Sequence, residues 1–228
     1  MKSNTYFDKV LASSLDKHKV NVREQDMDGL IVVDGSEASV QHILALQVGK
    51  YLSNTVRIVS DDKSFRKAVI AGLKYDCIIY DMTFEDVRKS TDLINVLDDI
   101  VQKNMFIILI VPTFFDLPKP ISAFKSKFLL HAWTKGNWTK ENFESGYFSA
   151  YDYKKKQELY TKGKKTYTYS LVKPNFKGRF TNEMDAELEK EMRKQRQKHV
   201  DEHKKGIKKA PKYLWDIGKK LRTNEESK

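Results

Sequence analysis

Residues 30–52 read LIVVDGSEASVQHILALQVGKYL, and this stretch decides the fold class. It opens with a continuous β-branched run, Leu30–Val33, which predicts a strand buried on both faces. The run ends at Asp34-Gly35, and from Ala38 to Leu52 the apolar residues recur at helical spacing over a wide face. A buried strand followed by an amphipathic helix is the beginning of a βαβ unit.

The same alternation continues on both sides of this stretch. Further strands are predicted at 56–59, 77–80, 105–111 and 128–133, and helices at 6–17, 61–73 and 84–103. Strands that alternate with helices predict an α/β fold, with a mostly parallel sheet of about five strands and flanking helices. Right-handed crossovers would then place the loops that follow the strands along one edge, where such sheets bind ligands.

The composition changes after Gly136. Aromatic-rich pieces at 147–151 and 159–160 flank three lysines, and they predict a small antiparallel β appendage with lysines on its turns. Residues 182–205 and the segment from Pro211 onward predict charged C-terminal helices with a thin apolar stripe. We therefore expect a core over 1–135, a basic aromatic meander over 136–181 and a helical tail over 182–228.

The net charge of +11 is unevenly distributed. Residues 1–118 carry 14 basic and 17 acidic side chains, whereas residues 119–180 carry 14 basic and 4 acidic ones. Residues 187–222 are also basic, with 13 basic and 6 acidic side chains. Such asymmetry favours a polyanionic partner, most often nucleic acid, although a solvated lysine-rich surface would have the same composition.

The stretch 30–52 resembles the corresponding segment of P-loop NTPases of the RecA/AAA-like type, in which a strand leads through GxxxxGK[ST] into a helix. The alignment places Gly35 at the first glycine and Val40 at the second. Gln41 then stands at the lysine and His42 at the serine or threonine. Of these four defining positions, only the one at Gly35 keeps the residue of the family.

The resemblance extends downstream, to about residue 135. The sequence CIIYDM at 77–82 looks like a Walker B strand that ends in Asp81, and Met82 occupies the place where such ATPases commonly carry a glutamate. The strand at 105–111 corresponds to one that ends in a polar sensor residue, here Thr113. The resemblance implies an ATPase-like core, and the departures from it fall where the chemistry would occur.

The replaced residues predict that ATP and Mg²⁺ are lost as cofactors. Val40 cannot share the backbone conformation that glycine gives the loop, and neutral Gln41 supplies no charge to the phosphates. The imidazole of His42 is a poor ligand for Mg²⁺, which prefers oxygen, and Met82 cannot orient a water molecule. Remnants of a cofactor site, without catalytic residues, are therefore expected at Gly35, Gln41, His42 and Asp81.

Three other polar features have simpler interpretations. His42 and Asp81 would lie at adjacent strand ends, so a new metal or catalytic pair is an alternative to a solvated or capping histidine. His131 lies inside a predicted strand and is expected to be structural. Asp34 and Asp116 are interpreted as turn residues.

The sequence predicts a catalytically inactive protein that acts by binding, to nucleic acid or within a nucleoprotein or ATPase-like assembly. Aromatics can stack on unpaired bases while lysines follow the phosphates, although the same aromatics could simply pack a small sheet. The candidate nucleic-acid-binding residues are Lys154, Lys155, Lys156, Lys162, Lys164, Lys165, Tyr167, Lys177 and Arg179.

Two other functions remain open at this point. One is an active but divergent ATPase of a DNA-handling or packaging machine. The other is a structural or virion protein that forms oligomers or docks on a protein partner through its C-terminal helices. A single cysteine excludes an internal disulfide framework. Because no apolar run approaches a membrane span and Met1–Lys19 has no signal-peptide pattern, we expect a location in the cytoplasm or in a virion.

Overall fold

The computed structural model describes residues 7–25, 27, 29–35, 38–83, 86–87, 93–101, 103–135, 144–181, 186–187, 189–195, 197 and 201. Its elements in chain order are α1 (Lys9–Glu24), β1 (Gly29–Gly35), α2 (Ala38–Leu52), β2 (Val56–Val59), α3 (Asp62–Ala71), β3 (Cys77–Asp81), α5 (Leu93–Val101), β4 (Phe106–Ile110), the 3-10 turn η2 (Phe114–Asp116), the π-helical turn η3 (Pro120–Lys125), β5 (Phe128–Lys135), β6 (Glu144–Tyr151), α6 (Tyr153–Gly163) and β7 (Phe176–Arg179).

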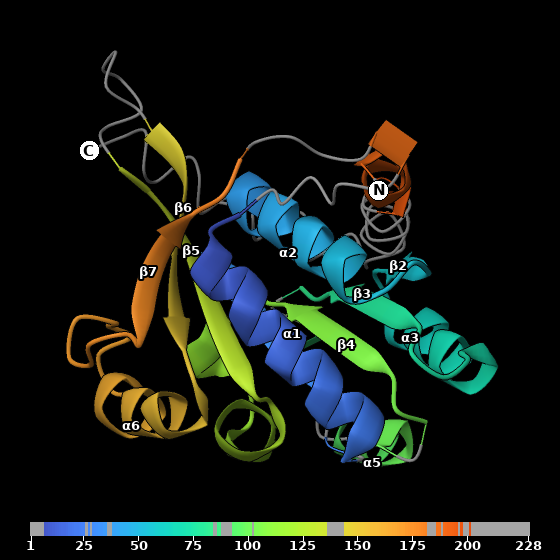
Figure 1. Ribbon diagram of the computed structural model, residues 1–228, viewed down its shortest axis with the longest axis horizontal. Helices are drawn as coiled ribbons and strands as arrows, with labels where there is room; N and C mark the ends of the chain where they lie inside the picture. Colours follow the sequence, from blue (N-terminus) through green and yellow to red (C-terminus); the bar gives the residue numbers. More distant parts are fainter. Residues whose placement is uncertain are drawn as a thin grey trace, which may run out of the picture.

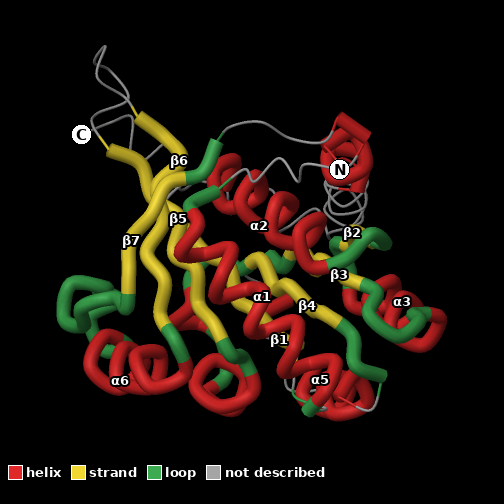
Figure 2. The backbone as a smooth tube through the Cα atoms, in the orientation of Figure 1, coloured by secondary structure: helices red, strands yellow, loops and turns green. Residues whose placement is uncertain are grey.

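The strands form one seven-stranded sheet in the order β2-β3-β4-β1-β5-β6-β7 (Figures 1 and 2). The five strands from β2 to β5 are parallel, and β6 and β7 are antiparallel to their neighbours. The predicted α/β fold with a mostly parallel sheet is confirmed. The antiparallel strands extend the same sheet beyond β5, so β6 and β7 are hydrogen-bonded to the core.

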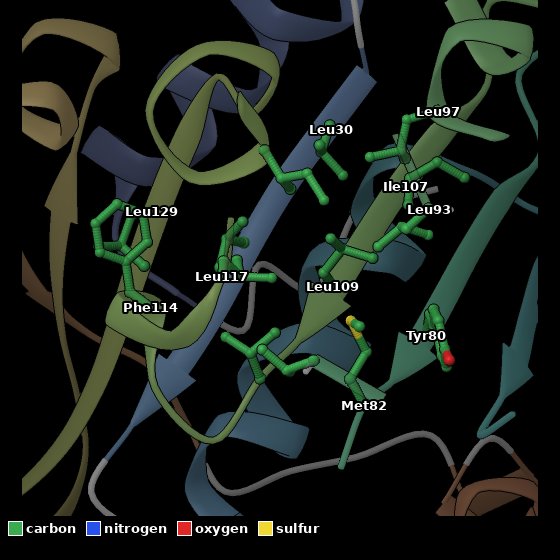
Figure 3. Close-up of a cluster of buried hydrophobic side chains, with 14 of the residues drawn as sticks. Leu30, Tyr80, Met82, Leu93, Leu97, Ile107, Leu109, Phe114, Leu117 and Leu129 are labelled. Carbon is green, nitrogen blue, oxygen red and sulfur yellow. The ribbon is translucent and has the colours of Figure 1, made fainter. Parts of the chain in front are cut away.

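Two hydrophobic layers cover the two faces of the sheet. On one face, α1 and α2 pack over alternate residues of the strands, and these helices lie in front of the sheet in Figure 1. On the other face, α3, α5 and the segment 114–121 pack over the remaining residues (Figure 3). Strand β4 is buried along its whole length because both layers cover it. Its continuous apolar run is thus explained by burial on both faces.

The connections that leave two neighbouring strands run to opposite faces. Strand β1 lies next to β4. The chain leaves β1 into α2 on one face, and it leaves β4 through η2 and η3 on the other. In open α/β sheets, ligands bind outside the carboxyl ends of strands at such a switch point. A ligand site is therefore expected at this edge of the sheet.

The prediction for residues 153–163 is wrong, because this segment is helix α6 and not part of a β meander. Asp152 caps the helix, since its carboxylate accepts a hydrogen bond from the Lys155 amide at 2.9 Å. The buried residues Lys156, Leu159 and Gly163 are spaced three and four apart, as on one helix face. The aromatic composition suggested strands, but the cap and this spacing determine a helix.

Part of the charged tail packs on its own core. Residues 189–195 are helical, as predicted, and Met192 is buried in the layer that contains α1 and α2. The Ser60 hydroxyl donates to the carbonyl oxygen of Gln195 at 3.2 Å. The segment from Pro211 onward lies outside the described residues. None of the helices described is both long and apolar enough to cross a membrane.

Lys156 is fully buried, although the sequence placed it among the nucleic-acid-binding residues. Its ammonium group donates to the carbonyl oxygen of Ser122 at 2.6 Å and to the hydroxyl of Ser126 at 2.8 Å. Burial, assisted by the nearby charge of Lys127, lowers the pKa of Lys156 to about 7. Lys156 therefore joins α6 to η3 and cannot contact an external ligand.

This buried amine predicts a specific pH dependence of stability. In the unfolded chain Lys156 has an ordinary pKa of about 10.4, so between pH 7 and 10 the unfolded state binds more protons and the contribution of Lys156 to stability rises with pH. Replacement Lys156→Met removes this contribution. We expect the variant to be more stable than the natural protein at pH 7 by an amount on the order of 2 kcal/mol, and this advantage to shrink towards pH 10.

The measurement is urea unfolding of both proteins at several pH values. Lys155→Met on the same helix is the matched control, because Lys155 is partly exposed and should show no such dependence. A constant difference between natural protein and Lys156→Met from pH 7 to 10 would contradict the assignment.

Candidate functional site

The junction between β1 and α2 leaves little room for a phosphate-binding loop. Helix α2 begins at Ala38, three residues after Gly35. Val40, Gln41 and His42 therefore lie inside the helix, and all three side chains are buried. A phosphate loop instead needs a run of non-helical residues whose amides point towards the anion. The alignment with the family thus places its second glycine and its lysine at positions that this chain has made helical.

Gly35 has a packing role that requires no ligand. A Cβ atom at this position would lie 2.6 Å from the carbonyl oxygen of Ala132 on the neighbouring strand β5. Gly35 and Ala132 are paired in the parallel ladder between the two strands. The close approach of two backbones explains the glycine, so the one residue that agrees with the phosphate-loop pattern carries no evidence for phosphate binding.

His42 and Asp81 contact each other directly. The Nε2 atom of His42, on α2, lies 2.9 Å from Oδ1 of Asp81 at the end of β3, and the two side chains are only 5% and 12% exposed. The expectation of a solvated histidine is wrong, because α2 packs against β3 and the ring is buried there. The following residue, Met82, is buried in the opposite hydrophobic layer (Figure 3).

Asp34 is the most buried polar group at this edge, and its interpretation as a turn residue is wrong. It lies within β1 and is 0% exposed. Its carboxylate accepts hydrogen bonds from the Phe114 amide at 2.8 Å and from the Tyr169 hydroxyl, and it contacts Nδ1 of His131 at 2.9 Å. Asp34 thereby connects β1 with β5, with the loop that follows β4 and with a segment that precedes β7.

His131 and Tyr169 form the outer layer of this group. Their rings are stacked, with centroids 3.8 Å apart and an interplanar angle of 18°. Burial and the neighbouring Asp34 carboxylate raise the pKa of the Tyr169 hydroxyl, which therefore stays protonated as a hydrogen-bond donor. The structural role that the sequence suggested for His131 is confirmed, and the ring in addition lines an open cleft.

Thr113, the residue at the sensor position, forms a side-chain hydrogen bond with the backbone. Its hydroxyl caps the turn η2 by accepting from the Phe115 amide at 3.4 Å. Asp116 lies in that turn, as the sequence suggested, and accepts a hydrogen bond from Tyr167 at 2.6 Å. Within the described part of the chain, no group of three or more His, Cys, Asp or Glu side chains could hold a metal ion.

Apart from the buried Lys156, the predicted nucleic-acid-binding residues separate into two groups. Six of them lie on α6 and the turn after it, namely Lys154, Lys155, Lys162, Lys164, Lys165 and Tyr167. Several are engaged within the protein: Glu158 pairs with Lys155 and Lys162, and the ammonium of Lys164 donates to the carbonyl oxygen of Phe115. The other group, Lys177 and Arg179, is exposed on β7.

Strand β7 brings its two cations to an aromatic pair that the sequence did not single out. The rings of Trp133 on β5 and Tyr147 on β6 are stacked, with centroids 4.8 Å apart. Lys177 lies over the Trp133 ring and Arg179 over the Tyr147 ring. The pairing of β5 with β6, which brings these residues together, is not visible in the sequence.

Comparisons with known proteins leave the family open. No protein-family model matches the chain, and no curated protein is recognisably similar in sequence. Among solved structures, that of C. elegans PCH-2 matches 59% of this chain and 45% of its own length, with 10% sequence identity and a TM-score of 0.40. The chain thus spans less than half of the structure it matches, and a similarity of this size carries no argument about function.

The burial of Asp34 predicts a graded loss of stability. Replacement Asp34→Ala should lower the free energy of unfolding by about 3–5 kcal/mol, because three donors lose their buried acceptor. Replacement Tyr169→Phe removes one of these hydrogen bonds and should cost about 2 kcal/mol. The matched control is Asp116→Ala, which removes the more exposed aspartate–tyrosine contact and should cost less than about 1 kcal/mol. Chemical denaturation measures all three, and equal losses for Asp34→Ala and Asp116→Ala would contradict the central role of Asp34.

Proposed function

We propose that this protein acts by binding nucleic acid and does not hydrolyse nucleoside triphosphates. The observation that carries the second part is the contact of 2.9 Å between His42 and Asp81. In the resemblance to P-loop NTPases, these are the positions of the magnesium-binding hydroxyl and of the Walker B aspartate. Mg²⁺ prefers oxygen ligands, so the imidazole of His42 is a poor substitute for the hydroxyl, and the Asp81 oxygen that the ion would use is engaged with that ring.

The neighbouring groups support the same conclusion. Gln41 is buried and neutral where the family has its lysine, and its side-chain oxygen has no hydrogen-bond donor among the described residues. A neutral side chain supplies no positive charge to the phosphates, which is what the lysine of the family provides. Met82 is turned into the hydrophobic layer, away from any water that it would have to orient.

The charge distribution supports nucleic acid as the partner. Residues 119–180 carry 14 basic and only 4 acidic side chains. The fold places part of this excess on exposed positions of β7 and α6, close to exposed or half-exposed aromatic rings. A positive groove with aromatic platforms is the usual construction of a surface that binds nucleic acid without strict sequence preference.

The absence of a nucleotide site is testable with the purified protein. Millimolar ATP with Mg²⁺ should leave the melting temperature unchanged and release no phosphate. A ligand at 100 times its Kd would stabilise the fold by about 2.7 kcal/mol, which is readily detected as a thermal shift. A shift that requires Mg²⁺ and disappears in Asp81→Ala would show that the site still binds nucleotide and would overturn this part of the proposal.

Binding of nucleic acid should depend steeply on salt. We expect the affinity for a labelled oligonucleotide to fall by at least tenfold between 50 and 200 mM NaCl, because phosphate contacts release counterions. Replacement of both β7 cations, in Lys177→Gln/Arg179→Gln, should reduce the slope of log K against log[salt] by about 1.4, that is about 0.7 for each lost contact to a single strand. Lys17→Gln/Lys63→Gln, which changes exposed lysines of α1 and α3, is the matched control and should leave the slope unchanged.

A further inference from the structure

Two cross-strand rows of side chains lie on one face of the antiparallel end of the sheet. The ladder aligns Trp133 with Tyr147 and Tyr147 with Arg179, so these three residues form one row across β5, β6 and β7. Two residues along each strand, His131, Ser149 and Lys177 form a second row. Residues two apart on a strand point to the same face, so both rows share one surface.

This surface is the face opposite to α1 and α2. The alternate residues of the same strands, such as Ala132, Phe148 and Phe176, pack in the layer that contains those helices. On the other side, α6 packs near Tyr151, while Trp133 and Tyr147 remain half-exposed. The two rings thus present apolar surface to solvent at a place where the described part of the chain does not cover them fully.

The second row forms the floor of an open cleft of about 660 Å³. The segment 169–176 forms one wall of the cleft, with Tyr169 and Lys173 among the lining residues. The volume lies within the usual range of small-ligand sites, roughly 300–1,000 Å³. The cleft therefore has space for a nucleobase beside the aromatic pair.

The floor of the cleft carries polar groups whose orientation is fixed. The Ser149 oxygen accepts a hydrogen bond from Nε1 of Trp133 at 3.2 Å, which leaves the hydroxyl proton able to donate to another group. His131 is held through Nδ1 by Asp34, so its Nε2 atom is the ring nitrogen that remains for a ligand. A donor and a ring nitrogen next to an aromatic stack can contact the edge of a base, while the stack supports the face of a base.

We infer that the cleft between β5–β7 and the segment 169–176 binds unpaired bases of single-stranded nucleic acid, with Trp133 as the stacking platform. This inference rests on the nucleic-acid-binding function proposed above. Lys173, Lys177 and Arg179 are exposed and lie at or beside the cleft, where they neutralise the phosphates that flank a stacked base. A duplex keeps both faces of its internal bases stacked, so it can use the cations but not the ring.

The test compares a labelled 15-nucleotide oligothymidylate with a blunt duplex of the same length, by fluorescence anisotropy with the full chain. We expect the single strand to bind at least tenfold more tightly than the duplex. Trp133→Ala should weaken the binding of the single strand by about tenfold and leave the binding of the duplex unchanged. Tyr153→Ala is the matched control, because Tyr153 is an exposed aromatic on α6, outside the cleft, with Lys127 and Lys156 over its ring, and its loss should change neither affinity.

A second variant covers the case in which Trp133→Ala does not fold. Trp133→Phe keeps an aromatic platform, so it should bind the single strand within about threefold of the natural protein. Binding of the oligonucleotide should quench the intrinsic tryptophan fluorescence of the natural protein, and this quenching should be largely lost in Trp133→Phe. Equal quenching in both proteins would overturn the inference.

The outcomes separate this inference from the function on which it rests. If duplex and single strand bind equally and Trp133→Ala has no effect, while Lys177→Gln/Arg179→Gln weakens both, the surface binds phosphates only. The inference of a base-binding site would then be wrong, whereas the proposed nucleic-acid-binding function would remain valid. If neither oligonucleotide binds at 50 mM salt, the proposed function is wrong, and so is the base-binding site that rests on it.

Discussion

The buried carboxylate of Asp34 is the interaction on which the carboxyl edge of the sheet depends. Removing a charged or polar group from water is costly unless hydrogen bonds replace the lost hydration. Asp34 meets this condition with a backbone amide, a tyrosine hydroxyl and a histidine ring, which come from three different segments. Because each donor must be in place for the carboxylate to be buried, the loop after β4, strand β5 and the segment before β7 are fixed relative to β1 and to one another.

A second aspartate at the same edge is used in a similar way. The carboxylates of Asp34 and Asp81 follow the apolar parts of β1 and β3, at the carboxyl edge where open α/β sheets bind their ligands. In this chain a histidine contacts each of them, His131 in one case and His42 in the other. Both side chains of this edge that could have bound a cation are thus engaged within the fold.

The regular elements were predictable where a local pattern determines them. Helix 38–52 and strand 56–59 occur with the predicted bounds, because a wide apolar face and a short β-branched run are sufficient evidence within their own windows. The failures concern residues whose partners are distant in the sequence. Asp34 precedes a glycine, as turn residues often do, but its three partners lie 80, 97 and 135 residues further along the chain. Lys156 is similar, since its acceptors are 34 and 30 residues away and lysine is rarely buried.

The same distant contacts link the two parts of the molecule. Asp34 holds His131 through Nδ1 and Tyr169 through its hydroxyl, and the stacked rings of these two residues line the cleft beside β5–β7. The carboxylate that fills the switch point between β1 and β4 therefore also positions part of the floor and one wall of the cleft. A ligand at the switch point would compete for the donors that build the cleft. The closed edge and the open cleft are thus consequences of one arrangement, because the carboxylate that fills the first also holds two of the residues that line the second.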